Sequence, residues 1–358
     1  MKNKIYLDYN ATAPLRPESA KAMVEIMKKP LNASAVHSFG RQGRMLVEKA
    51  RIQIATTINA PTPGQVIFNS GATESNNTIL KHFTGERILV STIEHISVLS
   101  AAPNAKHIPV TKDGIVDLNA LETLLKQKPT ALISVMMVNS ETGVIQPVKE
   151  ISTLTKNHGA LLHCDTTQAI GRIPVDMQDL GIDFLTFSSH KIGGPQGVGA
   201  LALGLCGITP TLLHGGGQEK SARAGTENVA GITGFGIAAE LATIPQSHQE
   251  KLETFLKSKG AIIYGENAPR VPNTTFFSIP NLKAETALMA MDLEDIAISN
   301  GSACSSGTVK PSHVLKAMGT SDDQALSGLR ISTGYATTQI EIDTFIEKFD
   351  KFLERIQK

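Results

Sequence analysis

The sequence contains few cysteines and carries almost no net charge. Cys164, Cys206 and Cys304 are the only cysteines among 358 residues, and they lie far apart. This spacing excludes a disulfide framework and matches no pattern of zinc ligands, so no metal site is predicted. The 34 lysines and arginines nearly balance the 33 aspartates and glutamates. The charge balance therefore gives no indication of binding to nucleic acid or to an anionic membrane.

Long apolar segments are missing as well. The N-terminus reaches Asp8 too early to contain the apolar region of a secretory signal. No apolar run approaches the roughly 18 residues that a membrane span needs. We therefore predict a cytoplasmic globular enzyme whose chain is long enough for two domains.

Strand and helix patterns alternate through the first two thirds of the chain. A helix is predicted at 151–158, ended by Gly159, and a long helix rich in glycine and alanine at 222–243. Short apolar runs predict buried strands at residues 66–68, 87–91, 131–138, 160–164 and 183–187. This alternation predicts an α/β fold with a mostly parallel sheet covered by helices.

A second unit is predicted after a boundary near residue 246. Its pattern predicts helices at 249–259, 284–293 and 339–356, and strands at 273–279, 296–299 and 329–333. We predict a large domain formed by residues 14–246. A small α+β domain, formed by residues 1–13 and 247–358, would carry Cys304.

Two polar residues at strand ends indicate a cofactor site. Asp165 follows the predicted strand 160–164, and Lys191 follows the strand 183–187 through Ser188-Ser189-His190. Open α/β sheets bind ligands at the carboxyl ends of their strands. A lone lysine after a strand is usually a surface residue, but a lysine and a carboxylate on successive strands are what pyridoxal phosphate needs. The lysine forms a Schiff base with it, and the carboxylate pairs with its pyridine nitrogen.

Two further segments have the chemistry of such a site. Residues 71–76 (Gly-Ala-Thr-Glu-Ser-Asn) follow a predicted strand and open a helix. The backbone N–H groups there, with the Thr73 hydroxyl, would bind a phosphate, although an ordinary helix cap has the same pattern. His95 lies just past a strand end, where a histidine is either structural or able to stack on the ring and move protons.

The cysteines differ in their surroundings. Cys304 lies among serines and glycines without apolar periodicity, which predicts an exposed loop and a thiol able to act as a nucleophile. Cys164 lies in an apolar strand and is predicted to be buried, whereas the pattern around Cys206 is ambiguous. Arg330 lies between apolar neighbours and needs an anionic partner. That partner is either a substrate carboxylate or a structural carboxylate of the protein.

At these residues the chain resembles the cysteine desulfurases, which are fold-type-I enzymes that use pyridoxal phosphate. The resemblance implies a large domain with a mostly parallel seven-stranded sheet and a smaller α+β domain. The segment around Cys304 resembles that of the class with a long cysteine loop, of the iron–sulfur assembly and nitrogen-fixation type. The matching stretches occur in order along the chain, at residues 6–14, 70–76, 92–95, 138–143, 187–191, 215–219, 223–228 and 302–307.

The resemblance implies roles for individual residues around the cofactor. Lys191 would form the Schiff base, Asp165 would pair with the pyridine nitrogen, and His95 would stack on the ring. Gln168 would bind the ring hydroxyl. The phosphate would be held by Ala72, Thr73, Ser188 and His190, and, from the partner subunit of a homodimer, by Thr226.

The resemblance also implies the reaction. Asn139 and Arg330 would bind the carboxylate of L-cysteine, which is converted to L-alanine while Cys304 receives the sulfur as a persulfide. A sulfur-acceptor protein, such as an iron–sulfur scaffold, would then take the sulfur. A selenocysteine lyase shares most of this site, whereas a class-V aminotransferase needs no loop cysteine. A sulfur-relay scaffold without catalysis is disfavoured by the intact Lys191, Asp165 and His95.

Overall fold

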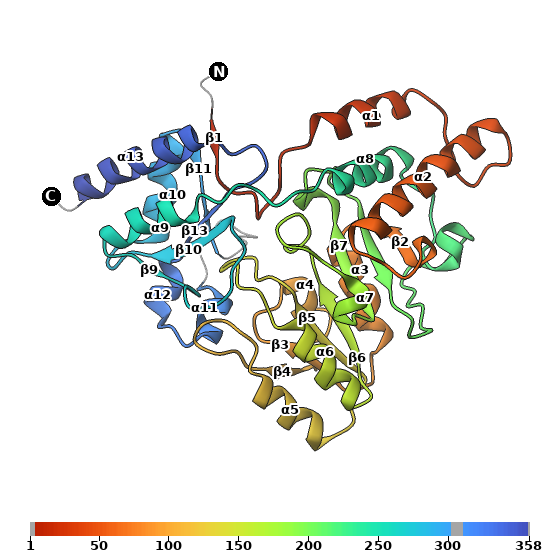
Figure 1. Cartoon of the computed structure of the whole chain (residues 1–358), viewed down its shortest axis with the longest axis horizontal. Helices are drawn as coiled ribbons and strands as arrows, with labels where there is room; N and C mark the ends of the chain where they lie inside the picture. The colour runs from red at the N-terminus through yellow and green to blue at the C-terminus, as the bar shows by residue number, and fades with distance from the viewer. Residues whose placement is uncertain (1–3, 302–310, 357–358) are drawn as a thin grey trace.

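Seven strands form the central sheet of the larger part of the molecule (Figure 1). In the computed structural model, which describes residues 4–301 and 311–356, their order is β2-β8-β7-β6-β5-β3-β4. Only β8 runs antiparallel to its neighbours, so the predicted seven-stranded and mostly parallel sheet is confirmed. The strands are β2 (Val66–Asn69), β3 (Ile88–Ser91), β4 (Lys106–Ile108), β5 (Leu132–Met136), β6 (Leu161–Asp165), β7 (Phe184–Ser188) and β8 (Gly199–Leu203).

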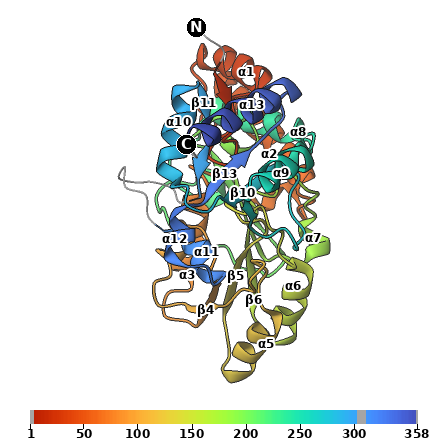
Figure 2. The same ribbon diagram turned by 90° about the vertical axis from the view of Figure 1, so that its left-hand side faces the viewer.

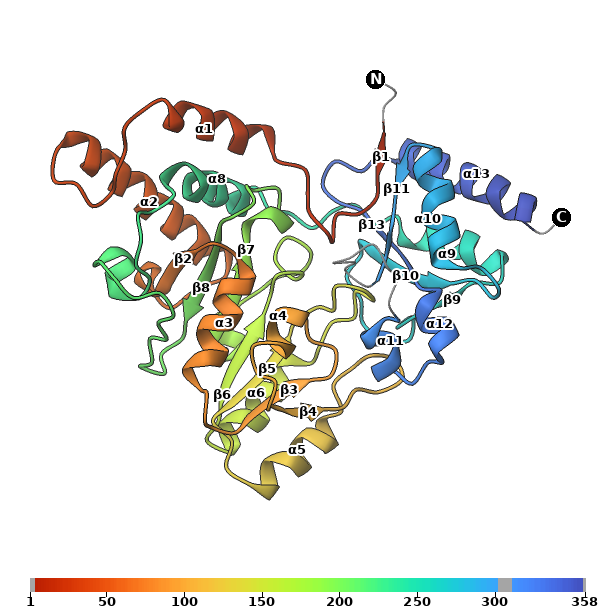
Figure 3. The ribbon, with the colours of Figure 1, turned by 180° about the vertical axis from the view of Figure 1, so that it is seen from behind.

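Helices cover both faces of this sheet, because its central strands are apolar on both sides. Every residue of β5, β7 and β8 is buried, as expected where helices cover both faces of a largely parallel sheet. One apolar core packs against α2 (Ser38–Thr57), α5 (Leu118–Gln127), α6 (Val148–Asn157), α7 (Met177–Leu180) and α8 (Val229–Glu240). A second core on the opposite face packs against α3 (Ala72–His82) and α4 (Ile96–Leu99), which lie in front of the sheet in Figure 3. In addition, α1 (Pro17–Met27) packs on α8.

The C-terminal third builds a separate core around a four-stranded antiparallel sheet. Its strands, in the order β12-β13-β10-β9, are β12 (Ser299–Asn300), β13 (Leu329–Ser332), β10 (Thr274–Ser278) and β9 (Ile262–Ile263). Five helices belong to this part (Figure 2): α9 (Gln249–Ser258), α10 (Ala284–Leu293), α11 (His313–Ala317), α12 (Asp322–Leu326) and α13 (Gln339–Ile356). The N-terminal strand β1 (Ile5–Tyr6) pairs with β11 (Ile296–Ala297), and Leu7 joins the same core. The domain boundaries themselves stay a prediction.

The structure differs from the predicted elements in two places. The predicted helix 222–243 is wrong in its first part, since α8 begins only at Val229, where the Asn228 side chain accepts a hydrogen bond from the Gly231 N–H. Gly225 has a φ of +104°, which no helix allows, so residues 222–228 form a loop. The predicted strand 296–299 is interrupted at Ile298 and divides into β11 and β12.

A buried ion pair fixes a strained turn at the edge of the large sheet. Glu219 lies in the short 3-10 helix Gln218–Ser221 and has a φ of +46°, and the next two residues also have positive φ. Its carboxylate accepts two hydrogen bonds from Arg51, at 2.7 and 2.9 Å, and one from the Phe68 N–H. Both charged side chains are almost fully buried, at 6% and 3% exposure. The protein therefore holds an unfavourable backbone conformation by satisfying a buried charge.

We expect Glu219→Gln to lower the free energy of unfolding by about 3–5 kcal/mol, because it removes the buried counter-charge of Arg51 and leaves this arginine with the half-exposed Glu48. Urea denaturation measures the loss. The matched control is Glu48→Gln: Glu48 also contacts Arg51, but its side chain is 51% exposed, so its loss should stay below about 1 kcal/mol. Equal losses in the two variants would contradict this account.

Candidate active site

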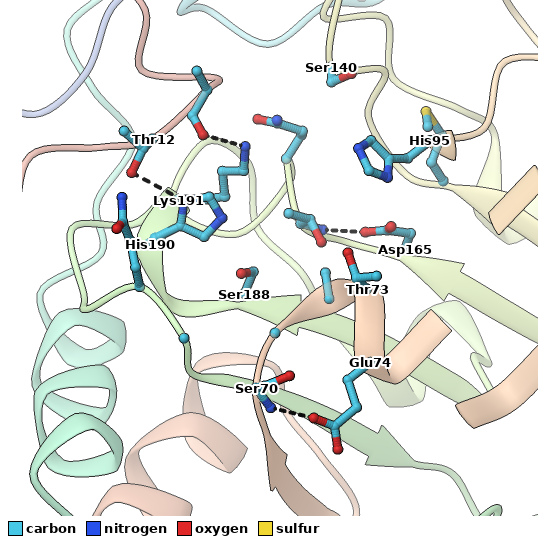
Figure 4. Close-up of a pocket in the computed structure, with 18 of the residues that line it drawn as sticks. Thr12, Ser70, Thr73, Glu74, His95, Ser140, Asp165, Ser188, His190 and Lys191 are labelled. Atoms are coloured by element: carbon cyan, nitrogen blue, oxygen red, sulfur yellow. Dashed lines mark hydrogen bonds between the residues drawn. The ribbon is translucent and has the colours of Figure 1, made fainter. Parts of the chain in front are cut away.

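Eight of the twelve predicted site residues line one cavity of about 540 Å³ at the carboxyl ends of β6 and β7. Figure 4 shows Lys191 and His190 on one side of this cavity and His95 and Asp165 on the other. The N-terminus of α3 closes it from below in that view. Its lining includes Ala72, Thr73, His95, Asp165, Gln168, Ser188, His190 and Lys191. The tertiary structure thus brings together eight of the residues that the sequence singled out.

Lys191 ends the short 3-10 helix Ser189–Lys191, which directly follows β7. Its ammonium group donates hydrogen bonds to the main-chain carbonyls of Asn10 and Ala11. Burial lowers the pKa of Lys191 to about 7, and the nearby guanidinium groups of Arg172 and Arg330 act in the same direction. At neutral pH a large part of this lysine is therefore an uncharged amine, which is the nucleophilic form.

Asp165 is the last residue of β6 and lies beside β7 in the parallel sheet. One carboxylate oxygen accepts a hydrogen bond from the Thr167 N–H and the other from the Asn76 side chain, both at 2.9 Å. Asp165 is only 5% exposed, and among the described residues no cation lies within ion-pair distance of it. A buried carboxylate that faces a cavity without a cationic partner is suited to bind a cationic or strongly donating group of a ligand.

The N-terminus of α3 offers hydrogen-bond donors to the same cavity. Gly71 precedes the helix with a φ of +146°, a conformation that favours glycine, and no side chain caps the helix. The N–H groups of Ala72 and Thr73 have no acceptor among the described residues, whereas the Glu74 N–H donates to the Gly71 carbonyl at 3.0 Å. Within the described part of the chain, the Thr73 and Ser188 hydroxyls also form no hydrogen bond. Free N–H groups and hydroxyls at a helix N-terminus form an anion site.

The two histidines of the cavity are both held as neutral rings. His95 caps α4, and its Nδ1 accepts a hydrogen bond from the Ser97 N–H at 3.1 Å. Shielding by the surrounding protein lowers the pKa of His95, against the opposite effect of Asp165. His190 lies 3.1 Å from the Thr12 hydroxyl, and burial, with the charge of Lys191, lowers its pKa to about 4. Neutral rings can stack on a ligand or donate a single hydrogen bond to it.

The N-terminal segment also lines the cavity, through Ala11 and Thr12. Sequence analysis predicted no role for this segment and identified it only as part of the matching stretch 6–14. The Asn10 carbonyl accepts hydrogen bonds from both Lys191 and Gln168. The other end of the Gln168 amide accepts a hydrogen bond from Arg172. The orientation of the Gln168 amide is thereby fixed, with its NH₂ group toward Asn10. Only the match at residues 6–14 pointed to this segment, because its cavity contacts are made by main-chain groups.

Arg330 lies in β13, and the structure pairs it with a carboxylate of the protein. Its guanidinium donates to Asp8 at 2.7 Å and to the Ser140 carbonyl at 3.0 Å. The Arg330 Nε, which is buried, has no hydrogen-bond partner among the described residues. The structural ion pair left open by the sequence is thus present, and one donor of the guanidinium is still unused.

Asn139 is buried and its hydrogen-bonding groups are used within the protein. Its oxygen accepts from the N–H groups of Glu141 and Thr142, and its nitrogen donates to the Ile93 carbonyl. The cavity is lined by the two neighbours of Asn139, Val138 and Ser140, but not by Asn139 itself. In this structure Asn139 shapes the turn after β5, and its predicted contact with substrate stays a prediction.

Arg330 and Thr226 also do not belong to the described lining of the cavity. Thr226 is exposed and lies in a neighbouring surface hollow, which shares Ser70 and Gly197 with the cavity. Cys304 lies outside the described residues. In residues 4–301 and 311–356, no group of three side chains could hold a metal ion, and no helix there has the length and apolarity of a membrane span.

Comparison with known proteins identifies the family. The sequence pattern of the class-V aminotransferases matches residues 5–345. The chain belongs to this family. Its members use pyridoxal phosphate, so the cofactor predicted from the sequence is confirmed at the level of the family. A cysteine desulfurase IscS of Dictyoglomus turgidum is 37% identical to the chain, over 100% of this chain and 96% of that protein.

Solved structures agree with this assignment. A NifS-like protein from Rickettsia africae superposes with a TM-score of 0.92 at 41% identity, covering 98% of this chain and 100% of that chain. SspA, solved in complex with cysteine, has a TM-score of 0.82 at 28% identity, covering 94% of this chain and 100% of that chain. The predicted fold class and the predicted resemblance to cysteine desulfurases are confirmed.

The cavity fits the cofactor of the family in three independent respects. The pKa of Lys191 is lowered to about 7. Asp165 lacks a cationic partner among the described residues, and the N-terminus of α3, which no side chain caps, provides free N–H donors. These groups match the aldehyde, the pyridine nitrogen and the phosphate of pyridoxal phosphate in chemical type.

The lowered pKa of Lys191 has a measurable consequence. Below pH 7 the lysine is an ammonium ion and cannot attack an aldehyde, whereas above pH 7 it is a free amine. We expect the rate of Schiff-base formation between the apo-protein and pyridoxal phosphate to rise with a midpoint near pH 7, rather than near the ordinary lysine value of 10.5. Stopped-flow absorbance measures this rate, and Lys191→Arg should remove the reaction. A midpoint near pH 10 would disprove the proposed environment of Lys191.

Proposed function

We propose that this chain removes sulfur from L-cysteine, releases L-alanine, and carries the sulfur as a persulfide on Cys304. The observation that carries the proposal is that Lys191, whose pKa is lowered to about 7, and Asp165, which has no cationic partner among the described residues, line one cavity of a class-V aminotransferase. The relatives named cysteine desulfurase match over the whole chain, which favours this reaction over others of the family.

Each cofactor contact would come from a residue of the cavity. Lys191 would bind pyridoxal phosphate as a Schiff base, Asp165 would accept the pyridine N–H, and His95 would stack on the ring. Ala72, Thr73, Ser188 and His190 would hold the phosphate, and Gln168 would bind the ring hydroxyl. When bound, pyridoxal phosphate supplies an electron sink that makes the α-proton of an amino acid acidic. Released by the incoming amine, Lys191 would be the base that removes this proton and returns it.

Arg330 is the proposed anchor of the substrate carboxylate. It lies close enough to Lys191 to influence its pKa, and its Nε–H is unused within the described residues. The Ser140 carbonyl and Asp8 hold its guanidinium from two sides. A substrate carboxylate at Arg330 would therefore share the guanidinium with Asp8, and the N-terminal segment would adjust to the bound substrate.

Sulfur transfer requires a thiolate in addition to these groups. The Cys304 thiolate would attack the sulfur of cysteine and form the S–S bond of the persulfide. The electron pair of the broken C–S bond would stay with the three-carbon product, which takes up a proton and leaves as alanine. A sulfur-acceptor protein, such as an iron–sulfur scaffold, would then receive the sulfur. A thiol that cycles through a persulfide needs a reducing compartment, so we place this protein in the cytoplasm.

A homodimer is the proposed active form. Exposed apolar side chains are frequent in α1, in α2 and in the segment that joins these two helices. A second copy of the chain would bury them. They include Val24 (54% exposed), Met27 (71%), Val36 (85%), Phe39 (47%), Met45 (70%) and Ile52 (53%). Thr226 is exposed beside its own cavity, from where it could contact a second copy. We propose that it binds the cofactor phosphate of that copy.

Replacement of the proposed nucleophile tests the function directly. Cys304→Ser should still bind pyridoxal phosphate and change its absorbance when cysteine is added, because Lys191 and Asp165 are intact. It should release alanine at least about 100-fold more slowly and carry no persulfide, since a serine hydroxyl is a far weaker nucleophile than a thiolate. Alanine release and persulfide mass spectrometry provide the measurement.

Cys206→Ser is the matched control for this experiment. Cys206 is half-buried in the described structure and lies outside the cavity lining, so its replacement should leave both signals intact. If Cys304→Ser released alanine at the rate of the unmodified enzyme, a lyase that releases sulfide directly would be the better description. Assays with cysteine and selenocysteine side by side distinguish a desulfurase from a selenocysteine lyase.

Subunit mixing tests the shared site. Lys191→Ala and Thr226→Val should each be inactive or weakly active alone, but a mixed dimer places both lesions in one site and leaves the other intact. Random exchange should restore about a quarter of the normal activity, because half of the dimers are mixed and each has one intact site. Activity is assayed after native mass spectrometry has shown exchange. Absence of recovery despite complete exchange would rule out sharing through Thr226.

A further inference from the structure

A second and much smaller cavity lies on the other side of Lys191, which lines both spaces. Its volume is about 30 Å³, and it is enclosed by the N-terminal segment, the turn after β6 and the loop after β13. Its lining contains three cationic residues, Arg16, Arg172 and Lys191, and no acidic residue. Of these three residues, only Lys191 has a role in the reaction proposed above.

Arg172 differs from the other buried arginines. The side chains of Arg51, Arg270 and Arg330 are less than 10% exposed, and the guanidinium group of each forms an ion pair with a carboxylate at 2.7 Å. Arg172 is equally buried, at 5% exposure, but no carboxylate of the described chain lies within ion-pair distance of it. Its hydrogen bonds go only to the carbonyl groups of Gln168, and its Nε and Nη2 have no acceptor among the described residues.

Arg16 contributes a second uncompensated guanidinium. Its Nε donates to the Ile192 carbonyl at 3.0 Å, and its charged group lies 4.0 Å from the centre of the Tyr335 ring. No carboxylate of residues 4–301 or 311–356 lies within ion-pair distance of it either. Thr333, another lining residue, is 2% exposed, and its hydroxyl has no partner in the described structure. The cavity therefore combines two unpaired cations with an unused hydroxyl donor.

Charge and size define what can fill this space. A buried guanidinium requires a counter-charge, and burial, together with the nearby charge of Arg330, lowers the pKa of Arg172 to about 9. A cavity of about 30 Å³ accepts one water molecule or one ion of similar size, but no phosphate or amino acid. Water would compensate neither charge, whereas one monovalent anion offsets one unit of the positive charge and accepts hydrogen bonds from the unused donors. We propose that one small monovalent anion, of halide size, binds in this cavity between Arg16 and Arg172.

Bromide is the probe that tests the proposal. The holoenzyme should be crystallised with bromide, and anomalous diffraction should show one peak inside the cavity. In solution, bromide should raise the melting temperature of the holoenzyme by about 2 °C or more, and the rise should saturate with bromide concentration, because the ion binds only the folded protein. Gluconate at the same ionic strength should not, because it is too large for the cavity.

Two variants remove the proposed ligands, and a third serves as control. Arg172→Met and Arg16→Gln should each abolish the saturable response to bromide. Loss of a buried unpaired charge is tolerated by folded proteins, and Arg16→Gln changes only a half-buried residue, so the test does not depend on one variant folding. Arg41→Gln removes an exposed arginine that donates only to the Val36 carbonyl and should leave the response unchanged.

Three outcomes would overturn the proposal. The first is a cavity that holds only ordered water in crystals grown with bromide. The second is a bromide response of equal size in the unmodified enzyme and in both Arg172→Met and Arg16→Gln. The third is an anomalous peak without a saturable response in solution, which identifies an adventitious ion only.

Discussion

Asp165 ends β6, Lys191 closely follows the adjacent parallel strand β7, and this arrangement determines the geometry of the whole site. Because β6 and β7 run side by side in the same direction, their carboxyl ends deliver both side chains to one edge of the sheet. The N-terminus of α3 reaches the same edge with its first N–H groups free. An amine, a carboxylate and an anion site thus come together through strand direction, and the surrounding residues adjust these groups.

The N-terminal segment depends on this arrangement and joins the two parts of the molecule. Its first residues pair with β11 in the core of the C-terminal part, and its later residues cross to the large sheet. Between these two ends, the Asn10 carbonyl accepts hydrogen bonds from Lys191 and Gln168. The Asp8 carboxylate accepts a hydrogen bond from Arg330. Changes at Arg330 can therefore be transmitted to Lys191 through a few residues of extended chain.

Burial and two nearby cations lower the pKa of Lys191, and burial has the larger effect. Arg172 and Arg330 lower its pKa in addition to burial, and Asp8 and Asp165 oppose them without cancelling the effect. The result is an amine that is reactive near neutral pH, which an exposed lysine is not. The cost of this arrangement is uncompensated positive charge behind the site, at Arg172 and Arg16.

The sequence by itself determined the parts of the protein that depend on local pattern and residue chemistry. Apolar runs predicted the strands β5, β6 and β7, and the polar residues at the ends of β6 and β7 made Asp165 and Lys191 candidate site residues. Only the tertiary structure decided which distant groups meet. β8 reads Gly-Ala-Leu-Ala-Leu, a pattern that becomes a strand through its pairing with β7 and β2. Likewise, the carboxylate partner of Arg330, Asp8, is 322 residues away in the sequence. Arg172 has no ion-pair partner because none of the described carboxylates lies close to it in space. The local sequence pattern specifies which residues are present at the ends of the strands. Packing then brings distant segments into contact, and these contacts determine the charge state and the partners of those residues.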